Sequence, residues 1–215
     1  MIIAVDGPAA SGKGTIAKAL ASHYNLPHLD TGLLYRAVAA TVKRLDLDPT
    51  READAVAACD FDELTLADPV LRDDEIGKLA SIVSAHPLVR AALFQRQKRF
   101  AHQEGGAVLD GRDIGMVIAP DADAKLFIRA TPQIRAQRRH KELQGHGSTV
   151  SFDKVLADIR ARDARDSGRA AAPLVMAGDA ALLDTSFLSI DASVQKAVAL
   201  VETRRVRSVG ITERQ

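Results

Sequence analysis

The sequence of 215 residues contains a single cysteine, Cys59, so no disulfide can form within the chain. This is typical of proteins from reducing compartments, and we interpret Cys59 as a small buried apolar residue. An excess of charge of one sign is also missing, since 29 Lys and Arg against 28 Asp and Glu leave a formal net charge of +1. Proteins that bind nucleic acid usually carry a strong basic excess. Any anion must therefore be bound by local clusters of basic residues.

Long hydrophobic runs are missing too, and none approaches the roughly 20 residues of a membrane span. The segment Met1–Asp6 lacks the basic residues that open a secretory signal. The six histidines match no metal-ligand spacing, and we interpret them as structural or surface residues. We find no internal repeat. We therefore expect a cytoplasmic monomer that binds neither nucleic acid nor a membrane.

Short apolar runs alternate with longer helical patterns along the chain. The runs predict strands at Ile2–Asp6, Pro27–Leu29, Ala107–Asp110, Lys125–Ile128 and Leu182–Asp184. The longer patterns predict helices at Lys13–Ser22, Leu33–Leu45, 74–102 with an interruption at Pro87, Ile134–Leu143, Phe152–Asp166 and Gln195–Arg204. Thr31, Thr131 and Ser151 are suitable N-caps. This alternation predicts an α/β fold, in which a parallel sheet is covered by helices on both faces and binds ligands at the carboxyl ends of its strands.

The first predicted strand leads into GPAASGKGT, residues 7–15. A strand, a glycine-rich turn and a helix in this order are typical of a phosphate-binding loop, whose backbone amides and helix dipole attract the anion. Lys13 adds a mobile positive charge, and the hydroxyl of Thr15 or Ser11 can help to hold Mg²⁺. The usual pattern places Ser or Thr directly after the lysine, whereas Gly14 follows Lys13 here. A glycine-rich turn without a ligand is the alternative interpretation.

Arginines cluster in four further segments, at residues 30–36 (DTGLLYR), 84–90 (SAHPLVR), 109–115 (LDGRDIG) and 160–174 (RARDARDSGRAAAPL). The ladder of residues 160–174, taken alone, fits a solvated helix face, because charges four residues apart often form one. LDGRDIG, taken alone, fits a plain exit from a strand into a turn. Residues 135–142 (RAQRRHKE) fit a surface helix, a nucleic-acid patch or a lid equally well. Together with the phosphate loop, however, the clusters indicate a second polyanion held close to the first, since transfer between two phosphates requires dense positive charge.

The chain resembles the bacterial cytidylate kinases, which are nucleoside monophosphate kinases that phosphorylate CMP and dCMP. The matching motifs occur in the family's order from residue 2 to residue 174: IAVDGPAASGKGT, LDTGLLYRA, LASIVSAHPLVRAALFQRQ, LDGRDIG, KLFIRATPQIRAQRR and RDARDSGRAAAPL. The DTG–YR, DGRD–G and RD–RD–R–PL patterns are more specific than the phosphate loop. The GKGT ending is itself typical of nucleoside monophosphate kinases.

The resemblance implies a five-stranded P-loop fold, an ATP and Mg²⁺ requirement, and direct in-line transfer to CMP or dCMP. It implies these ATP-binding residues: Gly7, Pro8, Ala9, Ala10, Ser11, Gly12, Lys13, Gly14, Thr15 and Arg138, with Thr15 also at Mg²⁺. It implies these acceptor-binding residues: Thr31, Arg36, Ser81, Arg90, Arg112, Asp113, Arg162, Asp166 and Arg169. Lys13, Arg112 and Arg162 would be catalytic, and Arg135, Arg138 and Arg139 would be candidates to close over ATP.

On the same resemblance, residues 1–215 form a single P-loop kinase domain. The core would comprise residues 1–30, 103–128 and 151–215, with an acceptor-binding segment at 31–102 and a lid at 129–150. The span Phe61–Leu79 is too short for the small-stranded insertion of many bacterial members, so acceptor closure or the preference for deoxycytidine could differ. Two alternatives stay open: a P-loop kinase for UMP, AMP or shikimate, and a P-loop protein that binds nucleotide or RNA without turnover.

Overall fold

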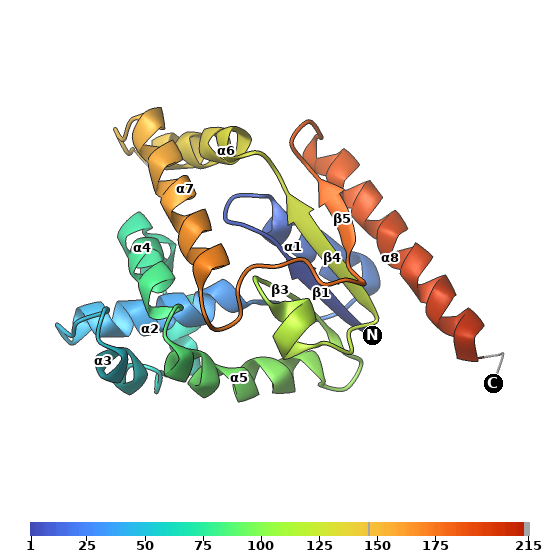
Figure 1. The fold of residues 1–215 in the computed structure, drawn as a ribbon, viewed down its shortest axis with the longest axis horizontal. Coiled ribbons are helices and arrows are strands. Elements are labelled where there is room, and N and C mark those ends of the chain that lie inside the picture. The colour runs from blue at the N-terminus through green and yellow to red at the C-terminus, as the bar shows by residue number, and fades with distance from the viewer. Residues whose placement is uncertain (146, 213–215) are drawn as a thin grey trace.

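The computed structural model describes residues 1–145 and 147–212. Its centre is a five-stranded sheet in which all neighbouring strands are parallel, in the order β2-β3-β1-β4-β5 (Figure 1). The strands are β1 (Ile2–Asp6), β2 (His28–Asp30), β3 (Ala107–Gly111), β4 (Ala124–Arg129) and β5 (Ala181–Asp184). The predicted α/β fold and its five strands are confirmed, with boundaries shifted by a few residues at most.

Helices cover both faces of the sheet and make three layers. On one face, α1 (Lys13–Tyr24) and α8 (Ile190–Thr212) pack against the apolar side chains of β1, β3 and β4. On the other face, α5 (Pro87–Ala101) and the single π-turn η3 (Ile114–Ile118) bury Ala4 and Leu109. Apolar strands covered on both faces are what a parallel sheet requires.

A second apolar cluster lies beside the sheet, on the left in Figure 1. It joins α2 (Thr31–Arg44), α3 (Glu52–Ala57), α4 (Asp74–Val83) and the start of α5. The short 3₁₀ helices η1 (Glu63–Ala67) and η2 (Pro69–Arg72) occupy the span where the family's insertion was expected to be shortened. Asp62 and Asp68 cap them by accepting from the backbone N–H groups of Leu64 and Val70.

A small third cluster holds α6 (Pro132–Gly145) against α7 (Phe152–Gly168), above the carboxyl ends of the strands in Figure 1. The predicted caps are present, since the Thr131 hydroxyl accepts from Ile134 N and the Ser151 hydroxyl accepts from Lys154 N. His146 is outside the described residues. No helix among the residues described is long and apolar enough to cross a membrane.

One local prediction was wrong. Thr31 is the first residue of α2 and not its N-cap, because Asp30 accepts from the backbone N–H of Gly32. The Thr31 hydroxyl donates instead to the carbonyl oxygen of Asp110 at the end of β3, 2.9 Å away. The predicted interruption at Pro87 is confirmed, since α4 ends at Val83 and Pro87 begins α5, where its missing N–H removes no helical hydrogen bond.

A buried carboxylate ties the first strand to the segment after β3. Asp6 ends β1 and is 6% exposed, and its two oxygens accept from the backbone N–H groups of Ile114 and Gly115, each at 2.8 Å. Burial raises the pKa of Asp6 from 3.8 to about 6, although the two amide hydrogen bonds act in the opposite direction. Asp6 therefore fixes Asp113 and its neighbours relative to the phosphate loop that follows β1.

This pKa shift predicts a stability difference that depends on pH. Because the folded pKa lies above the unfolded value, Asp6 contributes stability that is fully present below pH 3.8 and lost as the pH rises through about 6. The loss amounts to about 3 kcal/mol. Relative to Asp6→Asn, the wild type should lose stability between pH 4.5 and 7, as measured by urea unfolding at both pH values. A difference that stays constant with pH would contradict the shift.

Candidate active site

The phosphate loop has the backbone shape that anion binding requires. Gly12 has φ +89° and precedes α1 without a side-chain cap, so the first amides of the helix remain available to a ligand. Gly7 has φ +153°, and a Cβ there would lie 2.1 Å from the carbonyl oxygen of Ile128, so only glycine fits. Ala10 takes a left-handed φ of 57°, a strained conformation that is typical of functional sites. The buried hydroxyl of Ser11 has no hydrogen-bond partner among the residues described.

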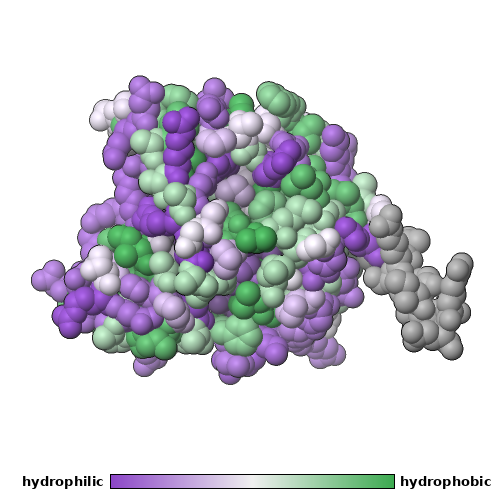
Figure 2. All heavy atoms as spheres, in the orientation of Figure 1, coloured by the Kyte–Doolittle hydropathy of each residue, from purple (hydrophilic) through white to green (hydrophobic). Residues whose placement is uncertain are grey.

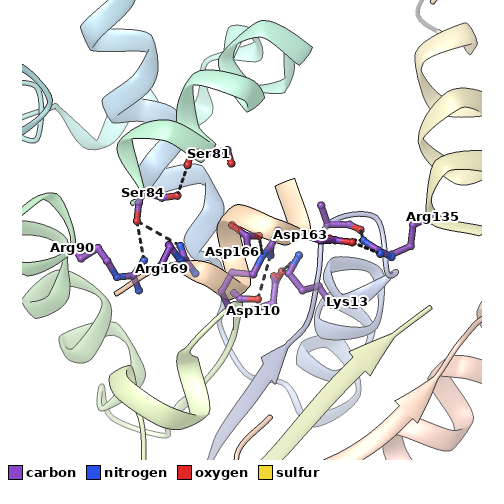
Figure 3. A network of polar contacts seen from close by, with 12 residues as sticks. Lys13, Ser81, Ser84, Arg90, Asp110, Arg135, Asp163, Asp166 and Arg169 are labelled. Atoms are coloured by element: carbon purple, nitrogen blue, oxygen red, sulfur yellow. Dashed lines mark hydrogen bonds and ion pairs between the residues drawn. The ribbon is translucent and has the colours of Figure 1, made fainter. Parts of the chain in front are cut away.

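Lys13 extends from the start of α1 into a crowded electrostatic environment. Its Nζ lies 3.9 Å from Asp110 Oδ2, and Figure 3 shows the two side chains next to each other. Burial, with a contribution from the positive charge of Arg112, lowers the pKa of Lys13 to about 8 against the opposing effect of the Asp110 carboxylate. An anionic phosphate at this position would therefore be strongly favoured.

A cavity of about 490 Å³ opens beside the loop, between α4, α7 and the carboxyl ends of the strands. Lys13, Ala9 and Ala10 line it, and so do all nine acceptor-binding residues expected from the sequence: Thr31, Arg36, Ser81, Arg90, Arg112, Asp113, Arg162, Asp166 and Arg169. Figure 2 shows hydrophilic side chains gathered over α4, α6 and α7 around this region. The arginine and aspartate ladder of α7 is therefore the wall of a cavity and not simply a solvated helix face.

One end of the cavity holds a paired acid and base. Arg90 of α5 forms an ion pair with Asp113, and both side chains are at most 10% exposed. The Arg90 guanidinium also lies 5.6 Å from the ring centroid of Tyr35 and donates to Ser84 O. The nearby Ser81 hydroxyl is buried and has no partner among the residues described. This end presents a carboxylate, a guanidinium and a hydroxyl at close quarters.

The adjoining wall is rich in arginines whose hydrogen-bonding capacity is not used up. Arg112 donates from Nε to Asp166 Oδ2 at 2.8 Å. The Nε atoms of Arg162 and Arg169 and the Nη2 atom of Arg169 are buried without partners in the part of the chain that the structure describes. Figure 3 shows Arg169 beside Ser84 and Arg90. Buried donors of this kind are costly unless a ligand accepts from them.

The pKa values of Arg162 and Asp166 are shifted by burial and by the charges of neighbouring side chains. Burial lowers the pKa of Arg162 to about 9, and the neighbouring Arg112 adds to the effect. Burial pushes the pKa of Asp166 upward, but the guanidinium groups of Arg112 and Arg162 outweigh it and hold the pKa below its usual value. Asp166 therefore stays ionised and offsets part of the repulsion between the two arginines.

The guanidinium group of Arg36 of α2 is held by the short segment that follows η1. Its Nη1 donates to the carbonyl oxygens of Leu71 and Asp73, at 2.6 and 3.1 Å. Burial lowers the pKa of Arg36, and the charge of Arg139 contributes in the same direction. Gly77 makes room for it, since a Cβ there would lie 2.7 Å from Arg36 Nη2. Neither the carbonyl acceptors of Arg36 nor the need for a glycine at position 77 was predicted from the sequence.

The three arginines of the expected lid have three different positions. Arg135 is 3% exposed and makes two hydrogen bonds to Asp163 of α7, at 2.8 and 2.6 Å, so it fastens α6 to α7 and is not available to close over ATP. Arg139 pairs with Asp74 of α4 and with Glu142. Arg138 donates to the carbonyl oxygens of Ser11 and Thr185 and to the Thr185 hydroxyl.

Arg138 also lines a second cavity, of about 330 Å³. Ser11, Gly12 and Thr15 of the phosphate loop border it, opposite the segment after β5 (Thr185, Leu188 and Ser189) and the start of α8 (Ile190 and Ser193). The loop thus borders both cavities, with Lys13 at the larger and Thr15 at the smaller. No sequence motif marked the segment after β5, because its residues form a site only through their position beside the loop.

Asp110 was also missed as a candidate, although the LDGRDIG motif placed it at the end of a strand. Its proximity to Lys13 depends on the register between β1 and β3, in which Val5 pairs with Asp110. Among the residues described, no group of three or more His, Cys, Asp or Glu side chains could hold a metal ion. Cys59 is half-buried, and burial raises the pKa of its thiol to about 11, so the thiol is unreactive at neutral pH.

The chain is similar to known proteins over nearly its whole length. A protein-family model described as Cytidylate kinase matches residues 3–203. The cytidylate kinase of Xanthobacter autotrophicus is 59% identical over 205 residues, which cover 95% of this chain and 99% of that protein. The cytidylate kinase of Azorhizobium caulinodans is 57% identical and covered completely, over 95% of this chain. A solved structure of an uncharacterized protein from Eubacterium ventriosum is similar in fold, with a TM-score of 0.55, 16% identity and coverage of 94% of this chain and 99% of that one.

The position of Arg135 generates a prediction about stability. Replacing Arg135 by Leu leaves Asp163 without its two hydrogen bonds and should lower the free energy of unfolding by about 3 kcal/mol. Arg129→Leu is the matched control, because the Arg129–Asp184 pair has side chains 57% and 42% exposed. An exposed pair of this kind contributes about 1 kcal/mol or less. Urea unfolding of both variants is the measurement, and equal losses would contradict a fastening role for Arg135.

Proposed function

This chain belongs to the cytidylate kinase family, and we propose that its larger cavity holds CMP or dCMP while the γ-phosphoryl group of ATP is transferred to it. The products are CDP or dCDP and ADP. The observation that carries this proposal is the cavity itself, in which all nine acceptor-binding residues meet Lys13 of the phosphate loop. Phosphoryl transfer between two nucleotides requires their phosphate groups to lie close together. A cluster of arginines is needed to offset the negative charge of these phosphates.

The Arg90–Asp113 end of the cavity binds the cytosine. Cytosine presents an exocyclic amine beside a ring nitrogen and a carbonyl oxygen. The Asp113 carboxylate accepts from the amine, while Arg90 and the free Ser81 hydroxyl donate to the acceptors. Uracil has a carbonyl in place of the amine, so its oxygen would face the Asp113 carboxylate with no hydrogen between them. An unpaired acceptor of this kind costs on the order of 1–3 kcal/mol.

The arginine wall binds and stabilises the phosphates. Arg36 and Arg162 contact the acceptor phosphate, and Arg112 reaches the group in transfer. Asp166 and Arg169 contact the acceptor sugar, with Thr31 beside them at the start of α2. Lys13, Arg112 and Arg162 neutralise the charge that develops during in-line transfer, and no covalent enzyme intermediate is needed. The acceptor phosphate is already anionic, so no general base is needed either.

The smaller cavity receives the nucleoside part of ATP. Its position on the far side of the phosphate loop suits a donor whose triphosphate runs along residues 7–15 toward Lys13. Thr15 and Arg138 line this cavity, and Arg138 is anchored to the loop through Ser11 O. The acceptor-binding segment 31–102 and the lid 129–150 then enclose the two nucleotides and exclude water, which limits wasteful hydrolysis of ATP.

Mg²⁺ accompanies the ATP phosphates in this proposal. The residues present suit it, because the Thr15 hydroxyl of the loop and the Asp110 carboxylate of β3, close to Lys13, are oxygen donors, and Mg²⁺ prefers oxygen and keeps several waters. The ion supplies neutralisation of charge on the β- and γ-phosphates when it is bound. The residues of the chain hold the phosphates in position around it.

The proposed reaction predicts a narrow acceptor range. ADP release with MgATP should be fast with CMP and dCMP and slow with UMP, AMP and shikimate. Lys13→Ala should lower kcat by on the order of 10²- to 10³-fold, because the charge on the transferring group loses its nearest cation. Turnover with a different acceptor would refute the proposed base recognition alone. ATP binding without turnover on any acceptor would support the non-catalytic alternative.

The proposed base contact predicts a change of specificity in Asp113→Ala. The ratio of kcat/KM for CMP to that for UMP should fall by about tenfold, because the amine of cytosine loses its acceptor. The KM for ATP should change much less. Glu63→Ala is the matched control, since it removes the partner of Arg96 from an exposed pair outside the cavity. An unchanged ratio in Asp113→Ala would contradict the assignment.

A further inference from the structure

His28 at the start of β2 and Asp110 near the end of the neighbouring strand β3 form a part-buried pair. In the parallel pairing of β2 and β3, His28 lies opposite Val108 and Asp30 lies opposite Asp110. Residues two apart on a strand share a face, so His28 and Asp110 lie diagonally on the face that α1 covers. The ring nitrogen Nε2 of His28 lies 2.8 Å from Asp110 Oδ1. The side chains are 16% and 2% exposed, so little solvent competes for this hydrogen bond.

The other oxygen of Asp110 faces the phosphate loop. Oδ2 lies 3.9 Å from Lys13 Nζ and 3.7 Å from where a Cβ on Gly14 would be. The main chain of Asp110 is held as well, since its carbonyl oxygen accepts from the Thr31 hydroxyl. The carboxylate is thus fixed on one side by His28 and presented to the lysine on the other. Rotation about the carboxylate's χ2 bond would disturb both contacts together.

We propose that His28 is a positioning residue for phosphoryl transfer, which acts by holding the Asp110 carboxylate toward Lys13 and the donor phosphates. The inference rests on the proposed function, because it assumes that Lys13 and Asp110 act on ATP. His28 donates from Nε2 to Oδ1, which restricts the carboxylate to the orientation in which Oδ2 faces the loop. A partner that orients a functional group in this way usually affects activity although it touches no substrate.

The same chain offers an internal comparison for a histidine–carboxylate pair. His102 at the end of α5 contacts Asp121 with Nε2 3.0 Å from Oδ2, but these side chains are 33% and 63% exposed and line neither cavity. Removing the His102 side chain deletes a similar hydrogen bond without changing anything near the phosphate loop. His102→Ala is therefore the matched control for His28→Ala.

Steady-state kinetics of His28→Ala, His28→Gln, Asp110→Asn and the double variant His28→Ala/Asp110→Asn test the proposal. His28→Ala should lower kcat/KM for ATP by about tenfold, and KM for CMP should stay within about twofold of the wild type. His28→Gln restores a donor of similar reach and should recover most of the loss. In the Asp110→Asn background, removal of His28 should have little further effect, because the two residues act as one unit. Calorimetric titration with a non-hydrolysable ATP analogue and Mg²⁺ should show weaker binding in His28→Ala than in His102→Ala.

The possible failures can be told apart. Wild-type kinetics in His28→Ala together with an impaired Asp110→Asn would overturn the role of His28 and leave the proposed function intact. Wild-type kinetics in Asp110→Asn would refute the role of Asp110 itself. An equal loss for both substrates in His28→Ala, with a lower melting temperature and no recovery in His28→Gln, would show that His28 only supports the fold.

Discussion

The site of this protein depends on keeping several cations close together in a space with little water. Lys13, Arg112 and Arg162 lie around one cavity, and burial together with mutual repulsion lowers the pKa of Lys13 to about 8 and that of Arg162 to about 9. Such a cluster is costly unless carboxylates or a ligand compensate it. Asp110 and Asp166 provide part of this compensation. The positive charge that these carboxylates do not compensate is available to a bound polyanion. An arrangement that is costly to the free protein therefore suits the binding of two nucleotides.

The sheet places these charges by bringing separate segments to one edge. The phosphate loop follows β1, and the Arg112–Asp113 segment follows its neighbour β3, to which Asp6 ties it through two buried amide hydrogen bonds. Because the loop borders both cavities, only a few residues of backbone would separate donor and acceptor in the proposed reaction. Strand order and the phosphate loop, residues 7–15, would then set the distance over which phosphate is transferred.

The three arginines of the expected lid come from one motif but contact different parts of the protein. Arg135, Arg138 and Arg139 lie within five positions of one helix, yet Arg135 fastens α6 to α7, Arg138 contacts the phosphate loop, and Arg139 reaches across to Asp74 of α4. The helical period of 3.6 residues turns adjacent side chains to different faces. The family resemblance implied the same role for all three arginines, because a motif does not reveal what each face of α6 packs against.

The sequence by itself determined the fold class, the five strands and the phosphate loop, which follow from local patterns of apolar runs and glycine spacing. The nine expected residues that line the larger cavity came from the resemblance to the cytidylate kinases and not from these patterns. Tertiary structure alone decided the cap of α2, the use of Gly77 to make room for Arg36, the second cavity after β5 and the pairing of His28 with Asp110. The reason is that each of these joins residues far apart in the chain. Whether a histidine on β2 meets a carboxylate on β3 depends on strand order and register, and composition and spacing within a single segment do not specify either.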